Sequence, residues 1–230
     1  MLPAHLSLTS AQGYSADQPV AQFELGDYKN FVYLILDHET RKTAIVDPQI
    51  DLEPILEVLA NGGFTLERIL LTHTHHDHVA GVPELLRNFP DILLNVHEKD
   101  LRRLPFDAAK WKGLELVREG SSISLGSLFI QVIHTPGHSS GECSYLLNAE
   151  RPYLFTGDTL FIRDCGRTDF DSGNNEEMFQ SLQKIKALTP ETVILPGHHY
   201  REETASTLTR ELKESPPLQC KNVAELAALP

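Results

Sequence analysis

The sequence predicts a mixed α/β fold in which layered sheets are covered by helices. Short apolar segments rich in β-branched and aromatic residues alternate with segments of helical period, and predicted strands outnumber predicted helices. The chain of 230 residues shows no internal repeat and no change of composition that would mark a linker. We therefore expect residues 1–19, which lack a clear period, to form an N-terminal extension and residues 20–230 to form a single domain.

The first half of this domain is predicted to open with three strands, in the runs VAQFEL, FVYLIL and TAIV. Residues 52–60 then place their apolar side chains at helical spacing, and Asn61-Gly62-Gly63 ends that helix. A strand over residues 68–71, a helix over 82–89 and a strand over 92–96 follow.

The second half is predicted to be richer in strands. Residues 114–133 have the pattern of short antiparallel strands, and the runs CSYLLN and PYLFT continue it. A helix over 176–188, a strand over 192–195 and a helix over 204–214 come next. Pro216-Pro217 ends the last of these, and a short helix over 223–229 is expected near the C-terminus.

Charge and composition exclude several classes of partner. The chain has 20 Lys plus Arg against 32 Asp plus Glu, a net charge of −12, so its surface repels nucleic acid. No run approaches 18 uncharged apolar residues, and MLPAHLSLTS has no basic start before an apolar core, so we expect neither a membrane span nor a secretory signal. Three scattered cysteines fit a reducing compartment, and we expect a cytoplasmic location.

A histidine-rich segment is the first candidate for chemistry. Four histidines and one aspartate fall within residues 73–78, directly after the apolar run 69–71. Because alternate side chains of an extended segment share a face, His73 and His75 can point together, and Asp77 and His78 lie one turn further on. Imidazole and carboxylate groups are ligands of borderline divalent metals. The alternative is a polar loop that is rich in histidine by chance.

Three later segments repeat one local pattern, an apolar strand followed by a small or rigid turn and then a potential ligand. The ligands in question are His138 after Pro136-Gly137, Asp158 after Gly157, and His198 after Pro196-Gly197. Ligands just beyond strand ends converge on one rim of a sheet, and glycine lets the backbone approach closely. Taken singly, each histidine would be an ordinary one, but the shared pattern predicts a common site.

The number of candidates indicates the type of site. The set has seven members: His73, His75, Asp77, His78, His138, Asp158 and His198. A closed structural zinc site needs only four ligands, so we expect two divalent metal ions bridged by one carboxylate, with room for water. Such a site lowers the pKa of bound water to about 7 and provides hydroxide at neutral pH.

The segments THTHHDH, TPGH, GDT and PGHHY resemble the metallo-β-lactamase superfamily, over about residues 20–200. The resemblance implies an αββα sandwich with the metals at one edge of the two sheets. It implies a first metal site of His73, His75 and His138, a second of Asp77, His78 and His198, and Asp158 as the bridge. His76 fills a variable position and is not expected to be a ligand. His134 and His199 flank ligands and are expected to support them or to face the substrate, with an exposed and idle position as the alternative.

Two branches of the superfamily are resembled. GDTLF at 157–161 and PGH at 196–198 look like glyoxalase II, which hydrolyses glutathione thioesters, but only about 30 residues follow Tyr200, too few for that family's helical glutathione-binding domain. Residues 162–170 look more like the persulfide dioxygenases, which oxidise glutathione persulfide with one iron and carry a CGRTDF run. HVAG at 78–81 and SPP at 215–217 depart from that second branch.

The first interpretation is therefore a metal-dependent thioester hydrolase that uses a metal-bound hydroxide. Asp77 and Asp158 would orient this nucleophile, and zinc is expected first, with iron or manganese as alternatives. The second is a persulfide dioxygenase with a single iron, held by a set such as His73, His138 and Asp158. The third is a non-catalytic metal-binding module. A nuclease of the superfamily is disfavoured by the charge.

Three side chains are candidate contacts for a small-molecule or carrier-bound thiol-derived substrate. Arg167 can hold a carboxylate with two hydrogen bonds, Tyr145 lies in a strand that both branches resemble, and His199 follows a ligand. A structural salt bridge for Arg167 and a packed position for Tyr145 are the alternatives. Cys165 is not expected to be a nucleophile, because Asp164 beside it raises the pKa of the thiol.

Overall fold

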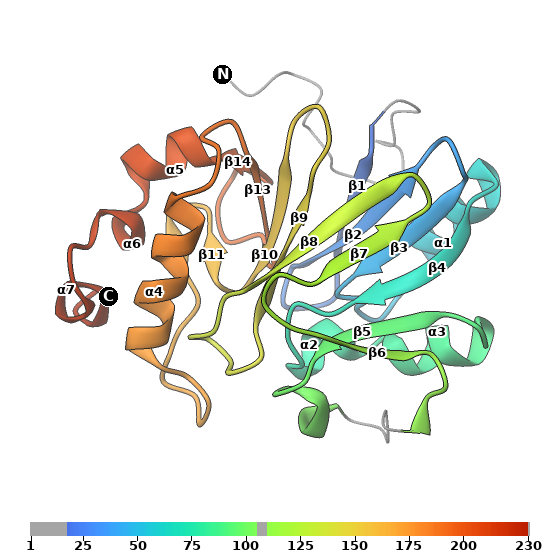
Figure 1. The fold of residues 1–230 in the computed structure, drawn as a ribbon, viewed down its shortest axis with the longest axis horizontal. Coiled ribbons are helices and arrows are strands. Elements are labelled where there is room, and N and C mark those ends of the chain that lie inside the picture. Colours follow the sequence, from blue (N-terminus) through green and yellow to red (C-terminus); the bar gives the residue numbers. More distant parts are fainter. Residues whose placement is uncertain (1–17, 105–109, 230) are drawn as a thin grey trace.

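The computed structural model describes residues 18–104 and 110–229 and has four layers. Two six-stranded sheets pack face to face, and helices cover the outer face of each (Figure 1). This αββα sandwich is the architecture that the resemblance implied. All but two residues of the expected N-terminal extension, Gln18 and Pro19, lie outside the described part of the chain, as do residues 105–109 within the expected domain.

The first sheet has the order β1-β2-β3-β4-β5-β6. Its strands are β1 (Val20–Leu25), β2 (Asn30–Asp37), β3 (Lys42–Val46), β4 (Thr65–Leu70), β5 (Leu93–His97) and β6 (Leu114–Val117). The first three are antiparallel, whereas β3 to β6 run parallel. Parallel neighbours need crossover connections, which contain α1 (Glu53–Gly62) between β3 and β4, and α2 (His76–Val79) and α3 (Val82–Asn88) between β4 and β5.

The second sheet has the order β14-β13-β10-β9-β8-β7. Its strands are β7 (Ser122–Leu125), β8 (Leu128–His134), β9 (Cys143–Leu147), β10 (Tyr153–Gly157), β13 (Val193–Pro196) and β14 (Ser206–Thr207). Only the pair β10 and β13 is parallel among these, and α4 (Asn175–Lys186) lies in the connection between them. A small hairpin of β11 (Leu160–Phe161) and β12 (Asp164–Cys165) follows β10.

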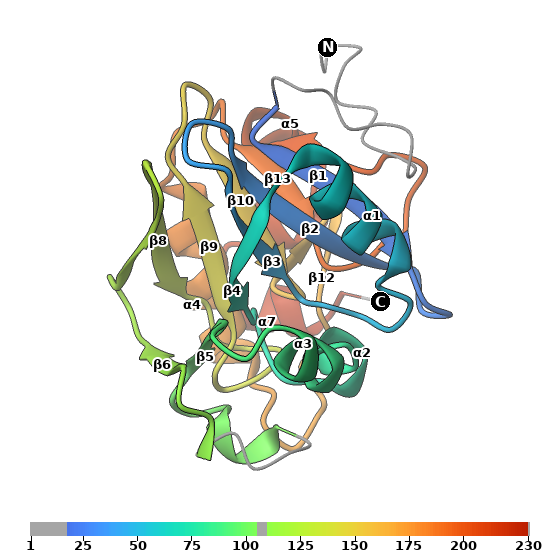
Figure 2. The same cartoon turned by 90° about the vertical axis from the view of Figure 1, so that its right-hand side faces the viewer.

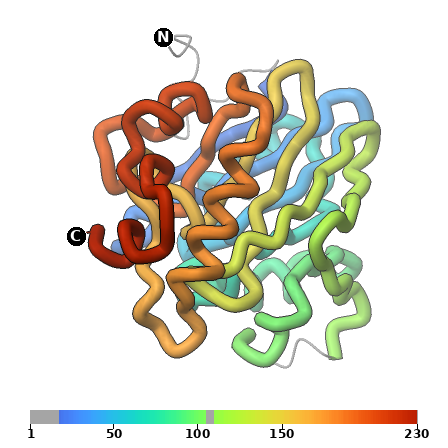
Figure 3. Tube along the Cα trace, turned by 60° about the vertical axis from the view of Figure 1, so that its left-hand side comes forward, coloured from blue at the N-terminus to red at the C-terminus, as the bar shows by residue number. Residues whose placement is uncertain are grey.

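Three apolar clusters separate the layers. One lies between the sheets and includes Tyr33 of β2, Val132 of β8 and Phe155 of β10. The second lies between the first sheet and helices α1 and α3, which Figure 2 shows in front of the strands. The third lies under α4, α5 (Leu208–Glu214), α6 (Pro216–Gln219) and α7 (Val223–Ala227), the orange and red segments in Figure 3. Most of each sheet is therefore buried on both faces, with outward side chains of β7 and β8 such as Phe129 left exposed, and the candidate ligands lie at the edges and loops.

Two expectations about secondary structure are wrong in part. Residues 114–133 do not all form antiparallel strands, because β6 pairs in parallel with β5 of the first sheet, and only β7 and β8 form an antiparallel pair. The helix expected from residue 204 begins at Leu208, since Ser206 and Thr207 pair with β13 and Thr207 caps the helix by accepting the Arg210 N–H. Among the helices that the structure describes, no segment combines the length and apolar character needed to cross a bilayer.

Candidate metal centre

The seven predicted ligands lie at the ends of strands from both sheets, along one edge of the sandwich. His73 and His75 follow β4 of the first sheet, and α2 carries Asp77 and His78. The remaining three, His138, Asp158 and His198, follow β8, β10 and β13 of the second sheet. The structure brings all seven side chains together.

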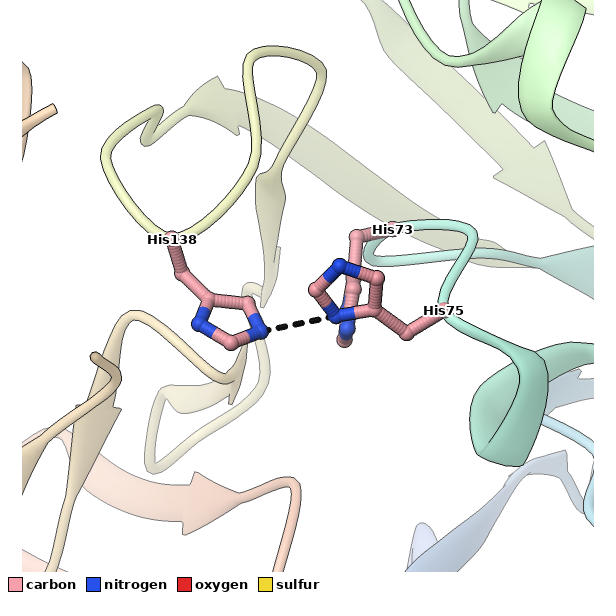
Figure 4. A group of neighbouring side chains, drawn as sticks. All are labelled: His73, His75 and His138. Atoms are coloured by element: carbon pink, nitrogen blue, oxygen red, sulfur yellow. Dashed lines mark hydrogen bonds between the residues drawn. The ribbon is translucent and has the colours of Figure 1, made fainter. Parts of the chain in front are cut away.

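Three histidines form the first group. One ring nitrogen of each of His73, His75 and His138 lies within 4.8 Å of the others. Figure 4 shows the first two extending from the loop after β4 and His138 reaching them from the loop after β8. The His138 Nε2 and His75 Nδ1 atoms are 2.9 Å apart. These are the residues that the resemblance assigned to the first metal site.

Asp77, His78 and His198 form the second group, again with ligand atoms within 4.8 Å of one another. The Nε2 atoms of the two histidines are 3.1 Å apart. Asp158 lies between the groups, because its Oδ2 atom is 3.4 Å from His138 Nε2 and 3.4 Å from His198 Nε2. A carboxylate in this position can serve both groups.

Backbone and side-chain acceptors fix the tautomers of these histidines. The Nδ1 atom donates to Asp47 Oδ2 (3.0 Å) in His78, to the Arg167 carbonyl (2.8 Å) in His138 and to the Tyr28 carbonyl (2.9 Å) in His198. With the proton held at Nδ1, the Nε2 lone pair of a neutral imidazole points to the centre. This is the arrangement by which metal-binding histidines are normally oriented.

His73 is fixed by the same principle through a hydroxyl group. Thr72 Oγ1 donates to Asp47 Oδ2 over 2.5 Å, so at its 3.0 Å contact with His73 Nδ1 it accepts the hydrogen bond. The His73 Nε2 atom is left facing inward. That atom and Asp158 Oδ1 are buried without a hydrogen-bond partner in the part of the chain that the structure describes. Buried polar atoms normally have a hydrogen-bond partner. Nitrogen and oxygen atoms that have a lone pair but no such partner are suited to coordinate a divalent metal ion.

The pKa values of the site agree with a centre that attracts cations. Burial lowers the pKa of His73, His75 and His138, to about 4 for His75, so these imidazoles are neutral at pH 7. Burial acts in the same direction on His78, but the carboxylates of Asp158, Asp47 and Asp77 outweigh it and raise its pKa to about 9. The carboxylates around His78 therefore favour a positive charge at this position.

Several residues that support the ligands were not predicted from the sequence. Asn30 donates from Nδ2 to Asp77 Oδ2 (3.0 Å) and accepts from Gln49 Nε2 (3.2 Å), which orients the Asp77 carboxylate. Asp47 accepts from the backbone of Thr72 at 2.8 Å as well as from His78. Asp47 follows the strand TAIV, so the pattern of a polar residue after an apolar strand was available to identify it.

Glycines permit the close approach of the ligand loops. Gly157 has a φ of +50°, and a Cβ atom there would lie 2.5 Å from Thr72 Oγ1. A Cβ atom at Gly197 would overlap the Oδ1 atom of Asp158. Glycine is required at both positions because another residue would push the ligand loops apart.

A cavity of about 850 Å³ opens at the metal centre. Besides ligands, its walls include Tyr28, Phe161, Arg167, Phe170, Tyr200 and Leu226. The Tyr200 ring stacks on His198, with centroids 4.8 Å apart, and the Phe170 ring packs edge-on against His75 and His138. The cavity therefore combines a polar floor with aromatic and apolar walls.

The three predicted substrate contacts lie in different surroundings. Arg167 lines the cavity, where its guanidinium is paired with Asp169 at 2.6 Å and lies over the ring of Phe170. Tyr145 is fully buried between the sheets and donates to the Leu71 carbonyl at 2.8 Å, which is the packed position left open as the alternative. His199 contacts Glu24 Oε2 at 2.6 Å through Nδ1, and its neighbour Tyr200, rather than His199, is among the residues that line the cavity.

Two other side chains considered from the sequence belong to neither ligand group. His134 stacks on His97 with ring centroids 4.1 Å apart, and its Nε2 contacts the Ser140 carbonyl. Cys165 lines the cavity, but burial, Asp164 and Cys220 raise the pKa of its thiol to about 12. The thiol is therefore protonated at neutral pH and is not a nucleophile there.

Residues 25–198 match the family model described as the metallo-beta-lactamase superfamily, a range that contains all seven predicted ligands. The chain belongs to this superfamily. Membership confirms the resemblance of the four sequence segments and agrees with the four-layer fold and with the position of the ligands at one edge of the sandwich.

Superfamily members with related sequences and structures are known. Hydroxyacylglutathione hydrolase of Pectobacterium carotovorum subsp. carotovorum is 40% identical over 171 residues, which make up 74% of this chain but only 62% of that protein's length. The crystal structure of ETHE1 from Myxococcus xanthus has a TM-score of 0.80 and 29% identity, and the match covers 93% of this chain and 92% of that one. A structure described as a di-iron-bound form has a TM-score of 0.71 and 28% identity, covering 84% of this chain and 97% of its own.

Proposed function

We propose that this chain is a binuclear metal-dependent hydrolase of glutathione thioesters. The observation that carries the proposal is the convergence of seven donor groups, five of which are oriented by hydrogen bonds to other residues. Four imidazoles have Nδ1 committed to a hydrogen bond, and Asp158 lies between the two ligand groups. The substrate class is taken from the names of the hydroxyacylglutathione hydrolases to which the chain is similar.

The ligand sets follow the two groups. His73, His75 and His138 would hold one ion, Asp77, His78 and His198 the other, and Asp158 both. Two divalent ions held there would supply Lewis-acid chemistry, which polarises a carbonyl group and lowers the pKa of a water molecule to near neutrality. Zinc fits imidazole and carboxylate ligands, and iron fits them equally, as the similar di-iron-bound structure illustrates.

The residues of the chain would bind and orient the reactants. Asn30 holds Asp77 Oδ2, the carboxylate oxygen that faces His78 and His198, and a carboxylate oriented in this way would orient the attacking water. The reaction adds water across the acyl carbon and sulfur, which releases a carboxylic acid and a thiol. Arg167 at the cavity wall would pair with a carboxylate of the glutathione part, and the aromatic walls would exclude bulk water.

Metal analysis and enzyme assays on one preparation test this proposal. We expect about two metal ions per chain, and release of free thiol from an acyl-glutathione thioester. Replacing a ligand, as in His75→Ala or Asp158→Asn, should reduce kcat/KM at least about 100-fold, because several kcal/mol of transition-state stabilisation is lost. His38→Ala, in the turn between β2 and β3, is the matched control and should retain activity. Activity within a few-fold of wild type in the ligand variants would refute the assignment.

A persulfide dioxygenase is the second candidate. It is favoured by residues 165–170, CGRTDF, which line or border the cavity, and by the agreement in length with the ETHE1 structure. It predicts one iron per chain and oxygen consumption with glutathione persulfide, with no thioester cleavage. A non-catalytic module predicts bound metal and turnover of neither substrate.

A further inference from the structure

Glu142 is a buried carboxyl group beneath the metal centre that has no role in the ligand set. It is fully buried and precedes β9. Its Oε1 atom accepts the backbone N–H of Asp158 at 2.7 Å and lies 3.6 Å from His73 Nδ1. The Oε2 atom has no hydrogen-bond partner within residues 18–104 and 110–229.

Backbone contacts place this side chain where three ligand segments meet. The Cys143 N–H donates to the Thr72 carbonyl, and the Thr135 N–H donates to the Glu142 carbonyl, both at 2.8 Å. A Cβ atom at Gly157 would lie 2.7 Å from Glu142 Oε1, so the loop that carries Asp158 is packed directly against the carboxyl. The position of Glu142 therefore restricts the position of the Asp158 loop.

A purely structural role accounts poorly for a carboxyl group at this position. Burying such a group is costly unless its hydrogen bonds compensate, and an apolar residue of similar volume would fill the space at lower cost. The one hydrogen bond that its carboxyl makes to described residues ends on the backbone of the shared ligand Asp158. This contact holds the backbone of Asp158 and so the position of its carboxylate between the two ligand groups. There Asp158 Oδ1 is 3.5 Å from His78 Nε2, and Asp158 Oδ2 is 3.4 Å from His138 Nε2.

We propose that Glu142 is a positioning residue for the bridging carboxylate: by accepting the Asp158 N–H it holds Asp158 where both metal ions can share it. The inference rests on the proposed function in one respect, the assignment of Asp158 as the shared ligand. Residues that orient metal ligands from outside typically affect metal affinity about 10- to 100-fold.

Two substitutions distinguish the effect of the hydrogen bond to the Asp158 N–H from the effect of the volume that the Glu142 side chain fills. Glu142→Gln keeps an oxygen acceptor for the Asp158 N–H, whereas Glu142→Met keeps the volume and removes the acceptor. Glu211→Met is the matched control, because Glu211 is also fully buried and accepts a backbone N–H, that of Arg163 at 2.7 Å. The readouts are metal ions per chain after dialysis, affinity by chelator competition, and the absorption spectrum of the cobalt-substituted protein.

We expect Glu142→Gln to bind two ions like the wild type and Glu142→Met to bind the second ion about 10- to 100-fold more weakly, with a changed cobalt spectrum. Glu211→Met should lower the melting temperature without changing metal affinity. Wild-type affinity in Glu142→Met, or a loss in Glu142→Gln as large as that in Glu142→Met, would overturn the inference. If Glu142→Met does not fold, the Gln variant decides, since loss of its second ion overturns the inference and retention supports it.

The proposed hydrolase function and the role of Glu142 are tested by different outcomes. A wild-type protein that binds two ions but cleaves no thioester contradicts the hydrolase and leaves the role of Glu142 intact. A wild-type protein that binds fewer than two ions contradicts both.

Discussion

Asp47 Oδ2 lies 3.0 Å from His78 Nδ1, at the base of the second ligand group. The same oxygen accepts the hydroxyl of Thr72, and through it Asp47 also orients His73. One buried carboxylate thus fixes one imidazole of each group. Since the orientation of the ligands limits how tightly the ions are held, Asp47 connects the two metal sites although it belongs to neither proposed ligand set.

Asp47→Asn should weaken metal binding about 10- to 100-fold, because an amide nitrogen in place of Oδ2 accepts a hydrogen bond from neither Thr72 nor His78. Chelator competition measures the affinity. Asp51→Asn is the control, since Asp51 is an exposed aspartate that also has a positive φ, +68° against +50° for Asp47. Equal affinities of the two variants would contradict the role given to Asp47.

Arg167→Gln should raise KM for an acyl-glutathione substrate about tenfold and leave metal content unchanged, because one charge-assisted hydrogen bond to the substrate is lost. Steady-state kinetics and metal analysis are the measurements. Arg151→Gln, a half-buried arginine outside the cavity that contacts the Glu191 carbonyl, provides the comparison and should keep the wild-type KM. An unchanged KM in Arg167→Gln would indicate that its pairing with Asp169 is structural.

Tyr145→Phe should cost about 1 kcal/mol of stability and leave the kinetic constants unchanged. The hydroxyl donates to the Leu71 carbonyl inside the core, and its removal leaves that carbonyl without this donor. Urea unfolding and steady-state kinetics test the two parts. A raised KM with normal stability would restore Tyr145 as a substrate contact.

Asp37→Ala should destabilise the protein by about 1–3 kcal/mol at pH 7, since Asp37 accepts hydrogen bonds from Thr40 and Ser127 and joins the turn after β2 to the β7–β8 turn. Burial opposes its ionisation, but these bonds prevail and lower its pKa to about 2. A lowered pKa stabilises the folded state above the ordinary value of 3.8, and this stabilisation is lost as the pH falls from 3.8 towards 2.

The difference in unfolding free energy between wild type and Asp37→Ala should therefore be full at pH 7 and smaller at pH 3. Urea titrations at both pH values, on metal-free protein, give the difference. Asp91→Ala, whose side chain is 89% exposed and pairs with Lys112, should change stability by less than about 0.5 kcal/mol at either pH. A pH-independent effect of Asp37→Ala would contradict the prediction.

The candidate ligands could be proposed from the sequence because each segment that carries them comes after an apolar strand, a pattern that is local in the sequence. Their supporting residues were less predictable. Glu142 stands before a strand rather than after one, and only the packing of three loops buries it beside Asp158. Asn30 starts β2 and reaches Asp77 across 47 positions of the chain, a contact that no local pattern contains.

The strands were easier to predict than their partners. The alternation of residues 114–117 indicates a strand, but it does not indicate that β6 pairs in parallel with β5, since that pairing depends on the connection between them. The helical period of the sequence includes Ser206 and Thr207, so these residues were predicted to be helical. In the structure they form strand β14, because their hydrogen bonds to β13 outweigh the local preference for a helix.

The ligands come from both sheets, four from the side of β4 and three from the ends of β8, β10 and β13. Bound cations would consequently crosslink the two sheets of the sandwich along this edge. Separation of the sheets would then require release of the ions. Chelation should then lower the melting temperature by an amount that grows with the ion concentration it removes. The concentration of metal ions in solution would therefore determine the free energy of unfolding of the protein as well as its activity.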